Sequence, residues 1–492
     1  MTNFVNKISK YGGYGFTNGQ VEAIEKLDTW YNNPKDLFFT LSGRAGTGKT
    51  YLLKCFVDEV VKHPLCVSAP THKAVRQIEY STGKKGKTLQ SLHGLRPNVN
   101  LEDFDLNNIK FDALGSPTFY NYKLIIIDEC SMINKGLHTL NERRAKDLGV
   151  KILYVGDAMQ IPPVNKNSEL DGMDSPTFSL SNYYELSEII RQGNNNPLID
   201  LLEVVVNDIK GGTSNFISYL SKNPIQINSE GEGYKLVTDF NKFLEETVEC
   251  FKSPEFSANT DYARVVAWKN KTVDNYNYLI RNKLIPHFSG PDSANELIDL
   301  NDLLIGYKTI LNDFNETTII NSEDYIVNNI VYRKSDAGFH TYAVTLTPRH
   351  GGTSINIHIV DHRNASFMVF YDKIKYKYFN ALYDKSMNRS SKWKEYFEYK
   401  NQFLSLITFP IKDGEDVKAY VTKDIDYAFC LTTHKLQGST ITNTFVDLND
   451  MLFYTNGKMV ANSRFAPNAI TMRNKLIYTA LSRTSKLATI HL

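Results

Sequence analysis

The stretch Gly43-Arg-Ala-Gly-Thr-Gly-Lys49-Thr50 matches the pattern G-x-x-x-x-G-K-S/T at every position. It follows the apolar run Leu37–Leu41 and precedes a helix-like segment, Tyr51–Val61, so it joins a predicted buried strand to a predicted helix. Glycines at these positions let backbone N–H groups curl around phosphate oxygens, and the start of the helix adds a favourable dipole. The pattern predicts a phosphate-binding loop on an α/β sheet.

Individual roles follow from the chemistry of this loop. We expect the glycines to shape the backbone around the phosphates, namely Gly43, Gly46 and Gly48. We expect Lys49 to lie on the β- and γ-phosphates and the hydroxyl of Thr50 to lie on Mg²⁺. The alternative is a glycine-rich turn with a chance lysine, which the flanking strand and helix disfavour.

Other short apolar runs extend the pattern beyond the loop. They are Leu65–Ala69, Leu124–Ile127 and Lys151–Val155, and polar or turn residues and a helix-like stretch follow each of them. This alternation is typical of a buried parallel sheet in an α/β domain. A second α/β stretch begins at Arg264–Trp268, and its pattern returns at Asp426 and runs to the end of the chain.

The sequence between these stretches differs in character. Alternating runs such as 354–360 suggest a small β-barrel, and the aromatic, lysine-rich run 370–403 looks helical. Packing of that run as a helical hairpin is favoured over a base-stacking surface. The simplest account is a β module inserted into the second of two α/β domains. The first domain is predicted to span 1–190 and to carry an insertion at 95–122. The second domain is predicted to span 191–285 and 419–492, and the module 286–418.

Two acids follow the run Leu124–Ile127. A buried strand would deliver Asp128 and Glu129 at its C-terminal tip, beside the phosphate loop. Asp128 is suited to hold Mg²⁺ through water, and Glu129 to polarise the attacking water, which a kinase acting on a hydroxyl would not require. Alone, such a pair could be a solvated turn. Together with the loop, it predicts hydrolysis of ATP with Mg²⁺.

Arginines from outside the loop could stabilise the charge that hydrolysis develops on the γ-phosphate. Arg191 and Arg483 are the candidates. Their spacing does not distinguish either of them from an ordinary surface arginine.

The order of the motifs resembles that of superfamily 1 helicases of the 5′-to-3′ branch, in particular the phage Dda family and, more loosely, the RecD family. Phe16–Gln20 is similar to the Q motif, which implies that Gln20 pairs with adenine. Gly156–Val164 is similar to motif III, which implies that Gln160 senses the γ-phosphate. Arg191 matches motif IV, and the segment 478–483 is similar to motif VI. The resemblance therefore implies that Arg191 and Arg483 are arginine fingers, which contact the γ-phosphate.

The resemblance also implies a track for single-stranded DNA. Segments 69–74, 88–93 and 432–439 are similar to motifs Ia, Ib and V, the last of which also touches nucleotide through Gly438. The residues that this places on DNA are Pro70, Thr71, His72, His93, Thr432 and His434. The implied architecture is two RecA-like domains, the second carrying an SH3-like barrel and a helical tower. The implied function is ATP-dependent movement 5′ to 3′ along single strands and unwinding of forked duplexes.

The insertion 95–122 lies where the Dda family carries a β-hairpin pin. Pro97 can stiffen its entry, and Phe104 offers a flat face against which the terminal base pair could break. Stacking of an unpaired base on an aromatic ring is worth roughly 1–3 kcal/mol, comparable with about 1.4 kcal/mol for one DNA stacking step. The alternative is that Phe104 packs inside the insertion.

One departure from the family concerns the barrel. Ser322 stands where relatives often carry a glycine, and serine adopts a positive φ less readily than glycine does.

Composition sets wider limits. The chain has 492 residues, a net charge of +2 and five cysteines without a C-x-x-C pair, which argues against a disulfide framework or structural zinc. We expect a monomer in a reducing cytoplasm (of a bacterial host if the chain is of phage origin), without a membrane partner, and with a single-strand-binding or replisome protein as a conceivable partner. Satisfied histidines are favoured over a metal site at the group His350, His358, Asp361 and His362.

Two other functions stay open. One is an RNA-directed helicase, because the motifs do not test for the 2′-hydroxyl. The other is an ATP-switched protein that clamps single strands without unwinding them, although Glu129 and Arg483 speak against it. A GTPase is disfavoured because no Asn-Lys-x-Asp motif occurs.

Overall fold

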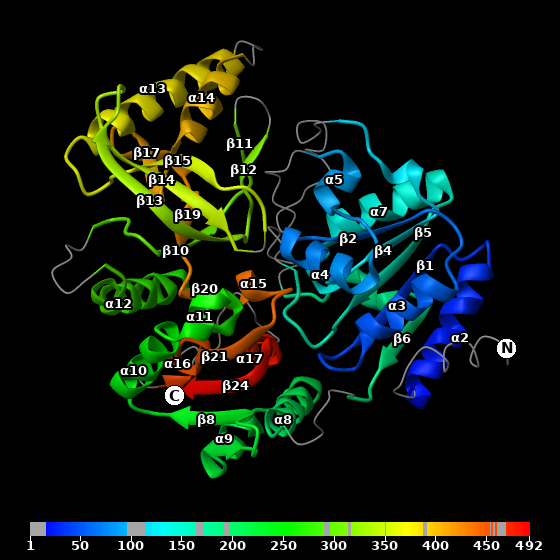
Figure 1. The fold of residues 1–492 in the computed structure, drawn as a ribbon. Helices are drawn as coiled ribbons and strands as arrows, with labels where there is room; N and C mark the ends of the chain where they lie inside the picture. The colour runs from blue at the N-terminus through cyan, green and yellow to red at the C-terminus, as the bar shows by residue number, and fades with distance from the viewer. Residues whose placement is uncertain are drawn as a thin grey trace. The chain divides into compact units, whose positions relative to one another are not determined.

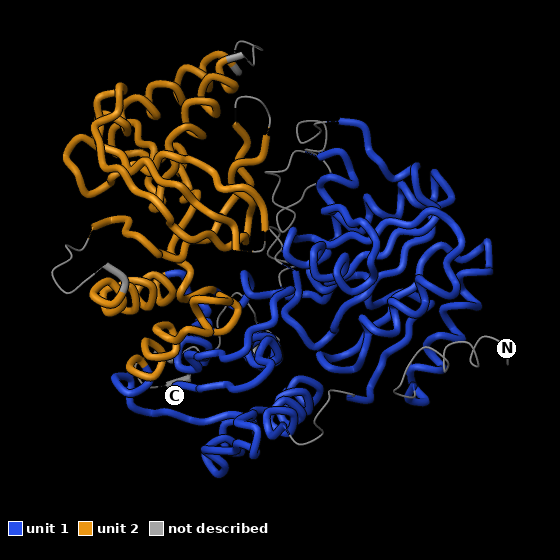
Figure 2. The backbone as a smooth tube through the Cα atoms, viewed as in Figure 1, with its two compact units in different colours: residues 1–243, 263–270, 432–492 blue, residues 244–262, 271–431 orange. Residues whose placement is uncertain are grey.

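The structure is a computed structural model. It describes residues 16–95, 115–163, 172–189, 196–289, 296–312, 316–349, 351–386, 391–452, 454–455, 458–459 and 469–492. The chain forms two compact units (Figure 2). Unit 1 comprises residues 1–243, 263–270 and 432–492, and unit 2 comprises residues 244–262 and 271–431.

The first sheet of unit 1 has the strand order β3-β2-β4-β5-β1-β6, with all neighbouring strands parallel (Figure 1). The expected parallel α/β sheet is therefore confirmed. Its strands are β1 (Phe38–Gly43), β2 (Leu65–Ala69), β3 (Gly86–Thr88), β4 (Leu124–Ile127), β5 (Lys151–Gly156) and β6 (Tyr183–Leu186). Its helices are α2 (Asn18–Asn32), α3 (Lys49–Glu59), α4 (His72–Thr82), α5 (Leu89–His93) and α7 (Lys135–Leu148), and its short 3-10 turns are Phe119–Asn121, Cys130–Met132 and Pro176–Ser179.

Apolar side chains cover both faces of this sheet. In β4, Ile126 packs into a cluster with Trp30 and Phe56, whereas Ile125 and Ile127 pack into a second cluster. Successive side chains of a strand point to opposite faces, so a strand buried on both faces has an unbroken apolar run. This burial fixes the strand tips from which the acids and the phosphate loop emerge.

A second sheet of unit 1 contains strands that are distant in the sequence. The strands of this sheet that lie wholly in unit 1 have the order β9-β21-β24-β8-β7, with all pairs parallel except the antiparallel pair β7–β8. The strands are β7 (Ile225–Ile227), β8 (Gly233–Val237), β9 (Ala263–Ala267), β21 (Ile441–Asp447) and β24 (Thr484–His491). The helices are α8 (Leu198–Gly211), α9 (Asn215–Lys222), α15 (Thr433–Leu436), α16 (Leu448–Met451) and α17 (Ala469–Ser482), with a small strand pair β22 (Tyr454–Thr455) and β23 (Lys458–Met459).

Unit 2 is built on a mostly antiparallel sheet of order β16-β15-β14-β13-β10-β19. Its strands are β10 (Leu303–Gly306), β13 (Asp324–Lys334), β14 (His340–Pro348), β15 (Ile355–Val360), β16 (Phe403–Leu404) and β19 (Ile425–Tyr427). Two strand pairs accompany it, β11 (Ile310–Leu311) with β12 (Thr317–Ile319), and β17 (Phe409–Asp413) with β18 (Asp416–Val421). The remaining elements are α10 (Phe240–Phe251), which starts in unit 1, α11 (Pro254–Ala258), the 3-10 turn Thr260–Tyr262, α12 (Asn270–Ser289), α13 (Phe367–Ser386), α14 (Ser391–Gln402) and β20 (Cys430–Thr432).

The aromatic, lysine-rich run is helical, as expected, and forms α13 and α14. Phe370, Ile374 and Tyr396 are buried in one cluster with residues of β17 and β18, as the packing interpretation expects, whereas Tyr376, Tyr383 and Phe397 of the same run are exposed. The SH3-like classification of the β-rich module stays a prediction.

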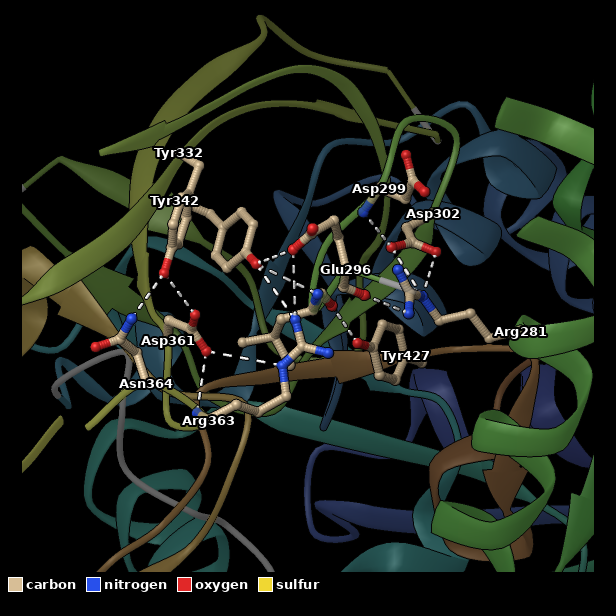
Figure 3. A network of polar contacts seen from close by, with 11 residues as sticks. Arg281, Glu296, Asp299, Asp302, Tyr332, Tyr342, Asp361, Arg363, Asn364 and Tyr427 are labelled. Atoms are coloured by element: carbon tan, nitrogen blue, oxygen red, sulfur yellow. Dashed lines mark hydrogen bonds and ion pairs between the residues drawn. The ribbon is translucent and has the colours of Figure 1, made fainter. Parts of the chain in front are cut away.

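A network of polar contacts joins helix α12 to the β-rich part of unit 2 (Figure 3). The Nε of Arg281 donates to both carboxylate oxygens of Asp302, over 2.8 and 3.0 Å, and both side chains are buried. The phenol of Tyr342 donates to Glu296 over 2.7 Å, and Arg363 lies 3.6 Å from the same carboxylate. These contacts fix the segment after α12 to the sheet.

The turn before β13 shows the effect of the departure at Ser322. This serine has φ 63°, in the left-handed region that glycine adopts without strain. The N–H of Ser322 donates to the carbonyl of Gly306 over 2.9 Å, and the N–H of Glu323 donates to the carbonyl of Ile320 over 3.2 Å. These backbone bonds hold the turn in the conformation that a glycine would favour.

Candidate nucleotide and nucleic-acid site

The phosphate loop connects β1 to α3, as the pattern predicts. Gly46 and Gly48 have φ of 85° and 76°, which side chains with a Cβ rarely adopt. A Cβ placed on Gly43 would lie 2.7 Å from Oγ1 of Thr47, so only glycine fits there. Thr50 is exposed on the first turn of α3, where its hydroxyl is free to reach a ligand. The loop has the shape and the open donors that phosphate binding needs.

The ammonium group of Lys49 lies over this loop. Its Nζ donates to the carbonyl oxygens of Gly43 and Arg44, the latter over 3.0 Å. Burial lowers the pKa of Lys49, because the charged form loses its hydration, while nearby carboxylates oppose the shift. These acids are Asp157, Asp128 and Glu129. Lys49 therefore lies where anionic groups of the protein and of a nucleotide would meet.

The two acids after β4 lie at the sheet edge beside the loop. The N–H of Asp128 donates to the carbonyl of Ser68, and Oδ1 of Asp128 accepts from the N–H of Glu129, both over 2.9 Å. Burial, and secondarily the charge of Glu129, raises the pKa of Asp128 to about 7. A cation at Asp128 would offset this burial. The carboxylate of Asp128 and the hydroxyl of Thr50 are hard oxygen donors of the kind that Mg²⁺ prefers.

Glu129 adopts a strained backbone conformation. Its φ is 52° and its ψ is 43°, although it is not a glycine. Such a conformation costs about 1–3 kcal/mol and persists where the surrounding structure enforces it.

The second sheet of unit 1 contributes residues to the same place. Nη1 of Arg483, which follows α17, lies 3.6 Å from Oε1 of Glu129. A Cβ placed on Gly438 would lie 3.8 Å from the same oxygen and 3.3 Å from Cβ of Ala74. Two of the sequence-predicted residues, about 310 and 350 residues after Glu129 in the chain, are thus brought to the predicted catalytic acid.

Helix α17 also contacts the loop after β5. Tyr478 donates to Oδ2 of Asp157 over 2.8 Å, and Thr479 Oγ1 accepts from the N–H of Ile161 over 3.0 Å. Lys475 Nζ donates to the carbonyl of Ala158 over 2.9 Å. Residues 475, 478 and 479 lie on one face of the helix, so a single helix face holds this loop. The sequence motifs alone assign no function to Tyr478, Lys475 or Asp157, because the partners of these residues lie far away in the sequence.

Several buried polar atoms around these motifs have no hydrogen-bond partner within the described residues. They are Oε1 of Gln160, Nε2 of Gln437 and Nε of Arg483. Buried polar groups in native proteins are nearly always paired, so such atoms fit contacts to a bound polar ligand such as ATP. Gln437 adds to the sequence-predicted set, and its position next to Gly438 is the signal that could have identified it.

The predicted adenine reader, Gln20, makes hydrogen bonds within the protein, and its pairing with adenine stays a prediction. Gln20 is 2% exposed, and its amide bonds to protein groups at both ends, Thr17 and Thr47. His93, predicted to contact DNA, is 1% exposed. Its Nε2 lies 2.7 Å from Oδ1 of Asn141, and Arg144 donates to its Nδ1 over 2.7 Å. A contact between His93 and DNA stays a prediction, and it would require these bonds to break.

The other DNA candidates lie at two helix starts of the same kind. Thr71 caps α4 by accepting from the N–H of Ala74 over 3.2 Å, and Thr432 caps α15 by accepting from Lys435 over 3.3 Å. His72 and His434 are partly exposed within these first turns, and Pro70 is buried before α4. Each start offers hydroxyl, imidazole and backbone donors of the kind that contact phosphates.

Three predicted residues lie outside the described residues, namely Arg191, Pro97 and Phe104. His350 also lies there. Among the residues that the structure describes, no three His, Cys, Asp or Glu side chains are grouped as a metal site would require. In the same part of the chain, no helix is both long and apolar enough to cross a membrane.

Comparisons with known proteins give a consistent set of relatives. A family model described as an AAA domain matches residues 15–222. An uncharacterised protein of Acanthamoeba polyphaga mimivirus is 25% identical over 96% of this chain and 98% of its own length. The ATP-dependent DNA helicase dda of Enterobacteria phage T4 is 28% identical over 50% of this chain. The ATP-dependent RecD2 DNA helicase of Deinococcus radiodurans is 32% identical over 32% of this chain.

This chain spans only part of the named relatives, 52% of the length of the dda protein and 20% of that of RecD2. Among solved structures, the Pif1 helicase from Candida albicans is similar with a TM-score of 0.48 and 17% identity, covering 97% of this chain and 94% of that chain.

Proposed function

Since this chain belongs to the superfamily 1 helicases related to Dda and RecD, we propose that it is an ATP-dependent DNA helicase. In this proposal it moves 5′ to 3′ along single-stranded DNA and unwinds duplex DNA. One observation carries the proposal, the approach of Arg483 and Gly438 to Glu129. It joins the second α/β sheet to the predicted catalytic acid of the first, as coupling of hydrolysis to movement requires.

The proposed hydrolysis assigns each group a separate task. The loop glycines and Lys49 bind the phosphates, and Thr50 with Asp128 would hold Mg²⁺. Bound Mg²⁺ neutralises charge on the phosphate oxygens. Glu129 accepts a proton from the attacking water, while Arg483 stabilises the charge that develops on the γ-phosphate. We propose Arg191 as a second finger and Gln160 as the γ-phosphate sensor on the strength of the resemblance alone.

The proposed DNA track uses the two capped helix starts. Thr71 and His72 at α4 and Thr432 and His434 at α15 would each hold the phosphate backbone. Contacts of Arg483 and Gly438 that differ between ATP and ADP would alter the separation of the two sheets. Alternate gripping at the two starts would then move the strand. Pro97 and Phe104 remain our candidates for the separating pin.

Several finer proposals rest on the same resemblance. We propose two RecA-like domains with the bounds predicted above and an SH3-like module at 286–418. The protein would act as a cytoplasmic monomer in replication, repair or recombination. A single-strand-binding or replisome protein is the class of protein partner that such a role would need.

A strand-displacement assay tests this function. Duplexes with either a 5′ or a 3′ single-stranded tail are mixed with the protein, Mg²⁺ and ATP, and Glu129→Gln serves as the inactive control. We expect displacement from the 5′-tailed DNA only. Displacement from RNA-tailed duplexes alone would favour an RNA-directed helicase. Binding of single strands with ATP turnover that DNA does not stimulate would favour an ATP-switched clamp.

A further inference from the structure

We infer that Lys308 is a site of covalent acylation, at which the side-chain amine takes up an activated acyl group from a thioester or an acyl phosphate. The site lies in unit 2 and shares no residue with the nucleotide and nucleic-acid sites, so it is independent of the proposed function. The observations that carry it are an uneven division of acids among three lysines and the exposure of one of those lysines.

The first of these lysines, Lys423, pairs with two acids. Its ammonium group lies 3.1 Å from Oδ1 of Asp274 on helix α12, and it also pairs with Asp426 on β19. The same group lies 4.5 Å from the centre of the Tyr307 ring. Burial opposes the charged form, but the charge of Asp426 outweighs it and raises the pKa of Lys423 above its usual range. Lys423 therefore stays charged, and both of its acids are engaged.

The other two lysines share a single carboxylate. Lys308 and Lys400 both donate to Oδ1 of Asp424, Lys308 over 3.4 Å, and within the described residues these are the ion pairs of the two lysines. Asp424 is buried, and its Oδ2 accepts from the N–H of Ser405 over 3.0 Å. Two ammonium groups therefore face one negative charge, and the like charges disfavour the protonated form of one of them.

Lys308 is the lysine that loses its proton more readily. Lys400, on α14, is buried against Asp424, whereas the side chain of Lys308 is 33% exposed. The Nζ of Lys308 also donates to the carbonyl of Thr422 over 2.9 Å, and a neutral amine still has an N–H for this bond. Burial, followed by the charge of Lys400, lowers the pKa of Lys308 to about 8. A sizeable fraction of Lys308 is therefore neutral near physiological pH.

A neutral and partly exposed amine is a nucleophile, and desolvation beside another cation is a known way to activate a lysine. The lone pair of Nζ attacks the acyl carbon, and an N–C bond forms. The bond from that carbon to sulfur or to the phosphate oxygen breaks, so the thiolate or phosphate leaves with the electron pair, and Nζ releases one proton to water. The amide keeps one N–H for the carbonyl of Thr422 and leaves Asp424 to Lys400 alone.

The test measures the acetylation rate of each lysine in the intact, folded chain. The protein is treated with limiting acetyl phosphate, and in a second arm with acetyl-CoA, across a series of pH values, and peptide mass spectrometry gives the rates. Lys283, exposed on α12, is the internal reference. We expect Lys308 to react about fivefold or more faster than Lys283 at pH 7.5, because a larger fraction of it is neutral. The donor that gives this difference identifies the source of the acyl group.

The pH dependence provides a second readout. The rate at Lys308 should reach half of its maximum near pH 8, whereas the rate at an ordinary lysine such as Lys283 should still rise above about pH 9.5. Lys400→Met removes the second ammonium group, so the midpoint of Lys308 should rise and its rate at pH 7.5 should fall by about fivefold or more. Lys394→Met, on the same helix at a side chain that is 81% exposed, should change neither.

Melting temperatures show whether each variant is folded, and the pH profile of the unaltered protein decides the inference even if Lys400→Met does not fold. Acetylation of Lys308 no faster than that of Lys283 with both donors would overturn it. A midpoint for Lys308 above about pH 9.5 would do the same, because that is the behaviour of an ordinary lysine. So would an unchanged rate at Lys308 in a folded Lys400→Met, since the shared carboxylate would then not cause the reactivity.

Discussion

The phenol of Tyr478 donates to Oδ2 of Asp157 over 2.8 Å, and both side chains are buried. The bond ties helix α17, which leads into Arg483, to the loop that carries Gln160. Burial, together with the nearby charge of Asp157, raises the pKa of Tyr478 well above its usual range, so the phenol stays a donor at physiological pH. A change in the position of α17 would therefore be transmitted to this loop.

Loss of this bond should slow turnover. In Tyr478→Phe the ring keeps its packing, but a buried oxygen of Asp157 loses its donor. Hydrogen bonds to charged groups contribute about 1.5–3 kcal/mol, so we expect DNA-stimulated ATP turnover to fall by about tenfold or more. Steady-state turnover with saturating single strands measures the effect. Tyr278→Phe, at a tyrosine that is 61% exposed, should change nothing. Equal turnover in both variants would show that Tyr478 does not couple helix α17 to the loop that carries Gln160.

Binding and hydrolysis of ATP should separate at two residues. Lys49→Ala should weaken nucleotide binding and abolish turnover, because the phosphates lose their cation. Glu129→Gln should keep binding and lose hydrolysis, because an amide can hydrogen-bond water but cannot accept its proton. Equilibrium binding of a labelled nucleotide and phosphate release provide the two readouts. Lys54→Ala and Glu25→Gln alter exposed residues of neighbouring helices and serve as controls. Hydrolysis by Glu129→Gln at the normal rate would show that another residue is the general base.

Removal of either proposed arginine finger should reduce turnover far more than nucleotide binding. Arg483→Ala should cut turnover by about 10³ or more, since a finger acts on the charge of the transition state. The resemblance predicts the same for Arg191→Ala. Single-turnover hydrolysis measures the chemical step, with Arg143→Ala as an exposed control. Near-normal turnover in Arg483→Ala would show that the contact between Arg483 and Glu129 is a structural ion pair and not part of catalysis.

Stability should depend on pH through His93. Burial and the charge of Arg144 lower the pKa of His93 from 6.5 to about 3. The unfolded chain then binds a proton that the folded protein does not, so the contribution is complete above pH 6.5 and is lost as the pH falls toward 3. We expect a loss of about 1.4 kcal/mol per pH unit in this window.

Urea unfolding between pH 7.5 and 4.5 measures the effect. His93→Gln should show a shallower dependence than the unaltered protein, by the equivalent of one proton, whereas His63→Gln at an exposed site should not. The same variant addresses the predicted DNA contact. Weaker single-strand binding by a folded His93→Gln at neutral pH would support a contact with DNA, and unchanged binding would limit His93 to the interior.

The buried pair of Arg281 and Asp302 should show a strong mutual dependence. Arg281→Met leaves the carboxylate buried without its partner, which typically destabilises by about 3–5 kcal/mol. Arg281→Met combined with Asp302→Leu should recover much of that loss, because no buried charge remains. A double-mutant cycle by urea unfolding gives the coupling. Arg363→Met, at a half-exposed arginine, should cost no more than about 1 kcal/mol. Additive effects at Arg281 and Asp302 would contradict the pairing.

The elements whose signals are local can be predicted from the amino-acid sequence. The glycines and Lys49 of the phosphate loop, and the two acids after β4, were identified because their roles depend on neighbours within a few residues. The buried parallel strands were predicted because burial on both faces requires an unbroken apolar run. The resemblance supplied the role of Arg483, which spacing could not give.

Which distant groups meet, and which polar groups are hydrogen-bonded within the protein, depends on the packing of the folded chain. Tyr478 and Asp157 lie 321 residues apart, so no local pattern could pair them. Gln20 and His93 each match a motif, yet both are buried and bonded within the protein. A motif records which residue stands at a position, whereas the accessibility of its atoms depends on the packing of other elements around it. The sequence therefore determined the chemistry available at each position, and the fold determined which atoms remain free to use it.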